Sequence, residues 1–211
     1  NKMIVMSEYV SKYSFLLLAM VAIPLIAEMD TILQLWLGEV PEYSSIFCQL
    51  ILIAALCDQL SVGLTSANQA IGNIRNYTLI FYTLKLMVLI IGWVCLYFGM
   101  SVASILWCYV GIELFTSLLR LPLMKWIADI PILPFCKHVF GRIIVPLIVM
   151  CSVCIICVRY IQTPYRLVIT IALSVVIGGI SIWLTAINKQ EKEIIIQSLN
   201  RFIPHNAKRH S

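Results

Sequence analysis

Long apolar stretches separated by short polar segments occupy this chain almost from end to end. They cover approximately residues 13–36, 46–67, 77–98, 102–121, 143–160 and 167–187. A helix needs roughly 20 apolar residues to cross the hydrocarbon core of a bilayer, and most of these stretches reach that length. Helices are expected, because an open sheet edge leaves backbone groups unpaired in lipid. The pattern predicts an all-α polytopic membrane protein with six transmembrane helices.

Composition and segment lengths support this prediction. Hydrophobic residues make up 61% of the 211 residues and the mean hydropathy is +0.96. Both values are far above those of a water-soluble domain of this size. Residues 1–187 are therefore expected to form one transmembrane lobe. Residues 188–211, with apolar positions at helical spacing among charges, are expected to form a cytoplasmic amphipathic tail. Residues 123–140, which contain prolines and charges, are expected to form a loop on the membrane surface. Because the chain begins at Asn1 without Met, we interpret it as a piece of a longer polypeptide.

The basic residues predict the orientation. Of fifteen Lys and Arg residues, twelve fall on one side of the predicted membrane, Arg159 and Arg166 fall on the other, and Lys85 lies inside a span. Loops rich in Lys and Arg stay in the cytoplasm, so both termini of the chain are predicted to be cytoplasmic. The net charge of +5 follows from this asymmetry and needs no nucleic acid partner.

The eight cysteines fall mostly inside the apolar stretches, where cysteine packs as a small apolar side chain. Packing is therefore a better interpretation than a disulfide framework. Cys151, Cys154 and Cys157 follow one another at intervals of three residues. Metal binding there would need a fourth ligand and thiolate charge in lipid, so no metal site is predicted.

Three charged residues inside the spans are the main candidates for a functional site, because charge within a bilayer is costly. At about 1.5 Å of helix rise per residue, Lys85 and Glu113 each lie ~12 Å from the inner surface, and Asp58 lies ~9 Å from it. An ion pair or a charged cavity between three helices would hold them there. The alternative for Lys85 is a side chain that extends along the lipid toward the headgroups.

The fourth span adds a polar stripe. Tyr109, Glu113, Thr116, Ser117 and Arg120 recur at helical spacing on one face, which must look toward other helices or water. Packing through hydroxyl groups accounts for Thr116 and Ser117, but less well for Glu113. The candidate substrate-cavity residues are Lys85, Arg120, Asp58, Glu113 and Tyr109.

The first span carries two further acids beyond Pro24, which is expected to kink the helix. Glu28 and Asp30 lie roughly 200° apart around a helix axis, so they cannot face the same way. They are candidates for coupling to an ion such as Na⁺ or H⁺. A purely structural role near the outer interface is the equal alternative. In the sixth span, Gly178 and Gly179 are typical of close helix packing.

Two stretches resemble a known transporter family. Residues 27–43 read AEMDTILQLWLGEVPEY and residues 58–77 read DQLSVGLTSANQAIGNIRNY. Their most specific parts, ILxLWLGxVP at residues 32–41 and QAxGxIxxY at residues 69–77, resemble the polysaccharide-transport branch of the multidrug/oligosaccharidyl-lipid/polysaccharide exporter superfamily. More narrowly, they are similar to the Wzx-type flippases of lipopolysaccharide O-antigen synthesis.

The resemblance implies one lobe of a two-lobe exporter fold, with this chain as the C-terminal lobe and an N-terminal lobe as its partner. Members carry an undecaprenyl-diphosphate-linked oligosaccharide from the inner to the outer leaflet of the bacterial inner membrane by alternating access. Cationic residues receive the lipid-linked substrate, no cofactor is needed, and a Na⁺ or H⁺ gradient is a candidate driving force. Other polysaccharide-assembly proteins are candidate partners. Gln69, Gly72 and Tyr77 would lie in a cytoplasmic turn and serve loop geometry.

Two other function classes stay open as alternatives. A membrane-embedded glycosyltransferase or acyltransferase would need His/Asp pairs or carboxylates at an interface, yet His138, His205 and His210 all flank the membrane on one side. A drug or cation exporter of the same superfamily would need a cavity dominated by acids, whereas these spans carry both signs. A transporter rather than an enzyme is therefore predicted, with no catalytic residues.

Overall fold

The structure is a computed structural model that describes residues 2–72, 74–128, 132–163, 165–188 and 191–192. The described part is helical and contains no strand, so the predicted all-α class is confirmed. Five helices are long and apolar enough to cross a membrane, or six if the bent pair α3–α4 counts as one span. The elements are α1 (Lys2–Ala27), α2 (Met29–Leu37), α3 (Ser44–Gln59), α4 (Val62–Ile71), α5 (Ile74–Tyr97), α6 (Ala103–Ala128), α7 (Ile132–Tyr160), α8 (Arg166–Ser181) and the π-helical turn η1 (Ile182–Ala186).

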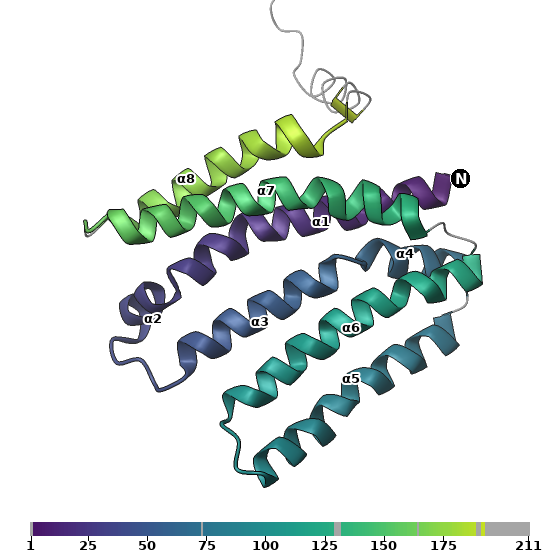
Figure 1. Cartoon of the computed structure of the whole chain (residues 1–211), viewed down its shortest axis with the longest axis horizontal. Coiled ribbons are helices and arrows are strands. Elements are labelled where there is room, and N and C mark those ends of the chain that lie inside the picture. Colours follow the sequence, from purple (N-terminus) through teal and green to yellow (C-terminus); the bar gives the residue numbers. More distant parts are fainter. Residues whose placement is uncertain (1, 73, 129–131, 164, 189–190, 193–211) are drawn as a thin grey trace, which may run out of the picture.

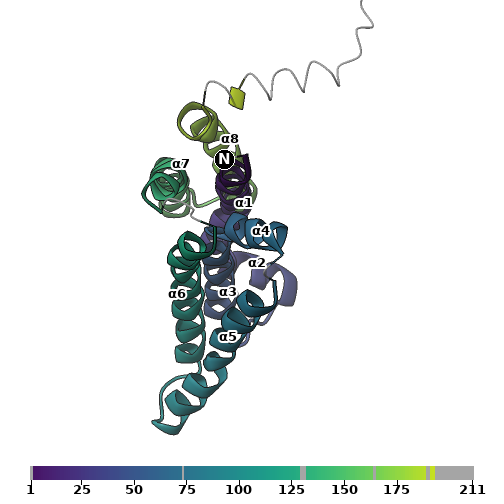
Figure 2. The same ribbon diagram turned by 90° about the vertical axis from the view of Figure 1, so that its right-hand side faces the viewer.

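Helix α1 lies at the centre of the arrangement. On one side it packs against α7 and α8, and on the other against α3 and α4. Figures 1 and 2 show α1, α7 and α8 running together, while α3, α6 and α5 extend away from them. Leu16 and Ala19 of α1 are completely buried, as expected for the central helix. Helix α5 lies at the far edge, where it packs mainly on α6.

The first predicted span is two helices rather than one. Helix α1 begins before the predicted start and passes through Pro24 without ending, since the Glu28 amide still donates to the Pro24 carbonyl at 3.1 Å. The break comes at Glu28, and α2 then leaves the line of α1 (Figure 1). Gln49 Nε2 donates to the Ile26 carbonyl oxygen at 3.1 Å, which satisfies one acceptor freed at the end of α1.

The second predicted span is bent by 46° between α3 and α4. At the break the Ser61 amide makes a short turn by donating to the Asp58 carbonyl at 3.3 Å. Helix α4 then lies directly on α1. The Gly63 amide donates to Ser11 Oγ at 3.0 Å, and a Cβ atom at Gly63 would collide with the Ser7 carbonyl oxygen. This close approach holds α4 in its bent direction.

The prediction of a surface loop at residues 123–140 is wrong. Helix α6 continues through Ala128 and α7 already begins at Ile132, with residues 129–131 outside the described part. Pro134 sits in the first turn of α7, where a missing amide costs little. The physical reason for helix here is burial, because three apolar side chains of this segment are completely buried. They are Met124, Phe135 and Val139.

The remaining elements lie close to their predicted positions. Helix α5 and the start of α6 match predicted spans, and α8 with η1 covers the sixth. Gly178 is buried against Met150 of α7, which confirms the close packing expected there. Of the predicted tail at residues 188–211, only Asn188, Glu191 and Lys192 belong to the described residues.

Candidate functional site

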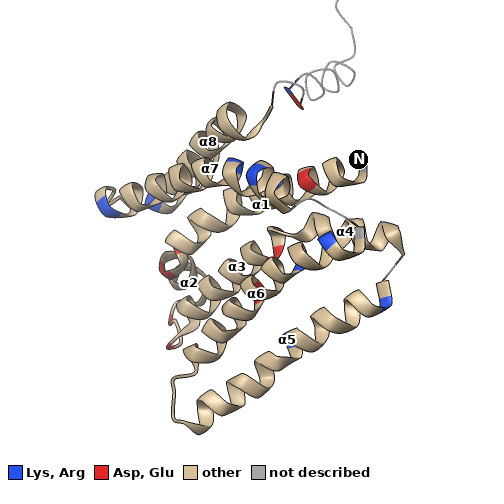
Figure 3. Cartoon of the chain, turned by 45° about the vertical axis from the view of Figure 1, so that its right-hand side comes forward, with Lys and Arg blue, Asp and Glu red and all other residues tan. Residues whose placement is uncertain are grey.

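The structure brings together four charged side chains from three helices, here called the charged cluster: Asp58, Lys85, Glu113 and Arg120. Lys85 Nζ lies 2.8 Å from Glu113 Oε1 and 3.6 Å from Asp58 Oδ1. Arg120 Nη2 donates to the same Asp58 oxygen at 3.0 Å. In Figure 3 the helices are tan along most of their length, with few charged positions. The ion pairing predicted from matching depths is therefore present.

The cluster has a buried side and an open side. Glu113 and Arg120, on α6, are only 2% and 6% exposed. The side chains of Asp58, near the end of α3, and Lys85, in the middle of α5, are about one-third exposed. Lys85 thus points at two carboxylates instead of running along the lipid, which favours the cavity interpretation over the alternative. Two cations and two acids leave the cluster electrically balanced.

Serine hydroxyls connect the cluster to the helix break. Arg120 Nη1 donates to Ser61 Oγ at 3.0 Å, and Ser61 Oγ lies 2.8 Å from Ser117 Oγ. The Arg120 guanidinium also lies over the Phe81 ring, 5.4 Å from its centroid. Ser61 belongs to the run of polar residues at the inner end of the second predicted span, and such a run predicts a helix that faces a water-filled cavity.

The polar stripe of α6 forms one buried face, as its spacing predicts. Thr116 is completely buried and Ser117 is 2% exposed, both toward neighbouring helices. Tyr109 lies within electrostatic reach of Glu113 on the same face. Hydroxyl packing accounts for the two smaller residues, while Glu113 is held by Lys85.

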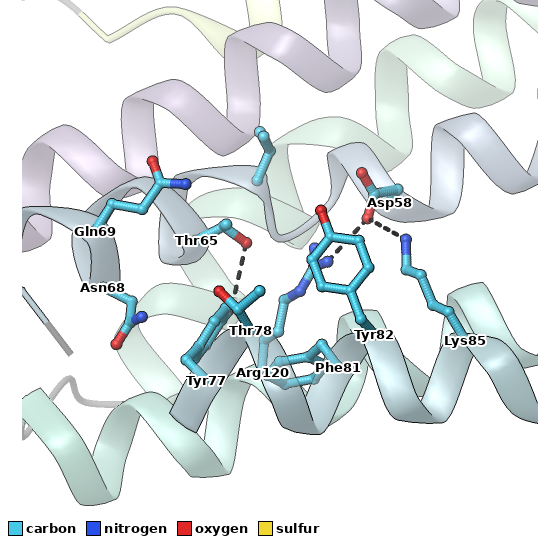
Figure 4. A pocket seen from close by; sticks show the side chains of 11 residues that line it. Asp58, Thr65, Asn68, Gln69, Tyr77, Thr78, Phe81, Tyr82, Lys85 and Arg120 are labelled. Carbon is cyan, nitrogen blue, oxygen red and sulfur yellow. Dashed lines mark hydrogen bonds and ion pairs between the residues drawn. The ribbon is translucent and has the colours of Figure 1, made fainter. Parts of the chain in front are cut away.

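A cavity of about 230 Å³ opens beside the charged cluster, between α3, α4 and α5, with Arg120 reaching in from α6 (Figure 4). Tyr77 and Thr65 close one side of it, with their hydroxyl oxygens 3.2 Å apart. Two cations and one acid line the cavity together with hydroxyl and aromatic groups, so a small anionic group such as a phosphate fits its chemistry. The lining residues are Asp58, Val62, Thr65, Asn68, Gln69, Tyr77, Thr78, Phe81, Tyr82, Lys85 and Arg120.

The second resemblance motif contributes directly to this cavity. Gly72 ends α4 with φ of +87°, a left-handed conformation that favours glycine, so its expected role in loop geometry is confirmed. The prediction that Gln69 and Tyr77 lie in a turn is wrong. Gln69 belongs to α4 and Tyr77 to α5, and both line the cavity. Tyr77 is only 4% exposed and packs on Phe81.

The two acids proposed for ion coupling separate, as their spacing predicts. Asp30 is exposed, whereas Glu28 is 1% exposed. Arg166 donates to both Glu28 carboxylate oxygens, from Nε at 2.8 Å to Oε1 and from Nη2 at 2.9 Å to Oε2. Thr31 and Thr170 add hydrogen bonds of 2.8 and 3.2 Å. This set of donors, here called the Glu28 clamp, joins the α1–α2 break to the start of α8 and favours the structural interpretation of Glu28.

A second buried ion pair joins the other end of α8 to α1, and sequence reasoning missed it. Lys12 Nζ donates to the two Glu191 carboxylate oxygens at 2.7 and 2.8 Å and to the Ala186 carbonyl at 3.1 Å. Tyr13 and the Asn188 amide donate to Glu191 Oε2 as well, at 3.0 and 2.8 Å. Lys12 and Glu191 are 2% and 4% exposed. We call this set the Glu191 clamp.

The environment of Glu191 favours its charged form. Burial opposes ionisation, but the hydrogen bonds from Lys12 and from the Asn188 amide outweigh it, so the pKa of this carboxyl lies below its ordinary value. Beside the clamp, Arg142 lies 3.9 Å from Glu191, and His138 pairs with Glu8 at 3.1 Å.

The described residues contain no group of three or more His, Cys, Asp and Glu side chains that is placed to hold a metal ion. Cys154 and Cys157 are buried within α7 and Cys151 is half-buried, in keeping with their interpretation as packing residues.

No family model, no curated protein and no solved structure matches this chain.

Proposed function

We propose that this chain is the C-terminal lobe of a membrane transporter that flips an undecaprenyl-diphosphate-linked oligosaccharide, an O-antigen unit or a related polysaccharide unit, from the inner to the outer leaflet. The observation that carries the proposal is the cavity beside the charged cluster. It presents Lys85 and Arg120 to an anionic group inside a molecule whose helices are mostly apolar. The resemblance of residues 32–41 and 69–77 supplies the identity of the substrate.

The charge arrangement suits an anion that binds and leaves. Lys85 and Arg120 share one oxygen of Asp58, so a phosphate oxygen in the cavity would compete with Asp58 for both cations. Because Asp58 and Lys85 are on the open side of the cluster, this exchange needs no opening of the core. A substrate phosphate would bind weakly enough to be released, since the carboxylate replaces it as the partner.

The size of the cavity supports a two-lobe protein. A volume of about 230 Å³ accommodates a phosphate group, but not an oligosaccharide and a long lipid chain. The rest of the substrate must then contact the proposed N-terminal lobe and the bilayer. Alternating access by rocking of two lobes around this cavity, in the bacterial inner membrane and with both ends of this chain in the cytoplasm, completes the proposal.

The coupling of transport to a Na⁺ or H⁺ gradient stays part of the proposal. Glu28 is hydrogen-bonded to Arg166, and Asp30 is exposed. Neither acid lines the cavity beside the charged cluster.

The first test is complementation with the complete gene that encodes this chain, in a bacterium whose own O-antigen flippase is deleted. We expect wild type to restore surface polysaccharide and Lys85→Met to reduce it by about tenfold or more, since loss of a close charged contact costs well over 1.4 kcal/mol. Lys85→Arg keeps the charge and should retain most export. Lys125→Met, at an exposed position in the last turn of α6, is the matched control and should export normally.

Protein abundance in the membrane is measured alongside, because Lys85→Met leaves Glu113 without its cation. Full export by Lys85→Met at normal abundance would reject the role of the cavity. No export by well-expressed wild type would leave a different sugar specificity or a drug exporter, and a screen of lipid-linked sugars and cationic drugs would separate the two. Sugar or acyl transfer by the purified protein would favour the enzyme alternative.

A further inference from the structure

Two cysteines of neighbouring helices lie in contact near one end of the α5–α6 hairpin. Cys95 Sγ is 3.9 Å from Cys108 Sγ. Cys95 lies in the last turn of α5 and Cys108 in the second turn of α6, on either side of the short connection between the helices. Both side chains are half-buried within the bundle.

The approach of the two helices at this point depends on a glycine. Gly92 is buried, and a Cβ atom there would lie 3.0 Å from Ile105 Cγ2, closer than ordinary packing. Gly92 precedes Cys95 by three residues and Ile105 precedes Cys108 by three, so each pair shares a helix face. The close contact that brings the sulfur atoms together is therefore made by the glycine, as at other close helix crossings.

Helix α5 is the least buried of the long helices, since only 11% of its most apolar 18-residue segment is buried inside the molecule. Among the described residues it packs mainly on α6 and more weakly on α4, and Lys85 contacts Asp58 of α3. A covalent bond to α6 would restrain it more than it would a central helix. Since α5 also carries Lys85, such a bond would help to position this cation in the charged cluster.

We propose that Cys95 and Cys108 form a disulfide bond in the cell. The asymmetry of Lys and Arg predicts that the α5–α6 connection lies on the outer side of the membrane, where disulfide bonds form and persist. Closing the bond brings the sulfur atoms from 3.9 Å to about 2.05 Å, a change that side-chain rotation and a small shift of the lightly packed α5 supply.

The reaction is a thiol–disulfide exchange with a disulfide-carrying thiol oxidant on the outer side. One thiolate attacks the oxidant's disulfide to form a mixed disulfide, and the second thiolate displaces the oxidant as a thiol. Cys95 and Cys108 together lose two protons and two electrons, and the oxidant's disulfide is reduced to two thiols. The proposal is independent of the proposed transport function, because it rests only on the hairpin and its orientation.

The experiment traps thiols in cells grown in air by acid quenching, and alkylates the complete protein before and after reduction. Mass spectrometry of its peptides then assigns each cysteine. In wild type we expect Cys95 and Cys108 to resist the first reagent in most molecules, to react only after reduction, and to appear as a joined peptide lighter by two hydrogen atoms. Cys48→Ser, at the opposite end of α3 from the charged cluster, is the matched control and should leave the bond in place.

Two variants test the cause. Cys95→Ser should free Cys108 for immediate alkylation, and Gly92→Leu should do the same to both cysteines by separating the helices, with the protein still present in the membrane. Wild-type protein in which both cysteines react before reduction would overturn the proposal, and so would a disulfide that joins either of them to a different cysteine. A disulfide that persists in Gly92→Leu would overturn the geometric argument. None of these readouts depends on transport.

Discussion

Each buried charge among the described residues is held by several partners at once, with one exception. An isolated ion pair seldom offsets the cost of removing two charges from water, and additional hydrogen bonds make up the difference. Glu28 and Glu191 each accept from at least three groups. Glu113 is the exception, because Lys85 holds Oε1, while Oε2 is buried with no hydrogen bond in the described part. Lys85 and Glu113 are therefore the pair of the cluster most sensitive to substitution.

The Glu191 clamp predicts how stability depends on pH. The pKa of Glu191 is lowered in the folded protein, so its carboxylate stabilises the fold fully above the ordinary value of 4.5, and this contribution is lost as pH falls through the folded pKa. Glu191→Gln should lower stability by about 3 kcal/mol near pH ~7, because Lys12 stays buried without its anion. Thermal unfolding in detergent from pH ~7 to ~3 should be steeper for wild type than for the variant. Equal slopes would contradict the prediction.

At the scale of helices, the local patterns were predictable and the breaks were not. The stripe on α6 follows from residue spacing alone, so its burial could be anticipated. Pro24 predicts a kink in the first span, but the position of the break at Glu28 is held by Arg166, which lies 138 positions later in the chain. The bend between α3 and α4 depends on contact with Ser7 and Ser11 of α1. Long-range contacts of this kind leave no trace in a hydropathy pattern, which is why each of these two regions resembles a single span in sequence.

The contact at Gly63 predicts a difference between two glycines in helices. Gly63→Ala places a methyl group against the Ser7 carbonyl and should destabilise the protein by about 1–3 kcal/mol, as overpacking does. Gly111→Ala is the matched control, since a Cβ atom there meets nothing within 4 Å, and it should be neutral or stabilising by up to ~1 kcal/mol. Thermal unfolding of both variants measures the difference. A Gly63→Ala protein as stable as Gly111→Ala would show that α4 does not depend on this contact.

At the scale of the whole molecule, the two clamps and the charged cluster lie in different parts of the structure. The Glu28 and Glu191 clamps join the two ends of the α8 region to α1. Helix α7 packs on both α1 and α8, so the three helices form one packed group. The charged cluster lies in the other half, between α3, α5 and α6. The meeting of Asp58, Lys85 and Glu113 could be inferred from depth along the helices, and the polar inner end of the second predicted span indicated a water-filled cavity. The contribution of Tyr77 could not be inferred, because it resembles a turn residue in sequence and lines the cavity only once α4 is bent.

The charges at the two ends of the molecule predict its orientation in the membrane. Lys12, Arg142 and Glu191 meet at one end, and Arg166 lies at the other with the α1–α2 break. The excess of Lys and Arg at the first end predicts that it faces the cytoplasm. A phosphatase reporter that is active only after export should then be active when inserted at residues 98–102, between α5 and α6, and inactive when fused after residue 211.

The reverse activities would place the α5–α6 connection in the cytoplasm. Cys95 and Cys108 would then face a reducing compartment, and their thiols should react with the alkylating reagent before reduction. The charged cluster would keep its geometry, since none of its contacts depends on which side is outside. The reporter result therefore separates the orientation from the cavity, and decides whether the disulfide proposal has the oxidant that it requires.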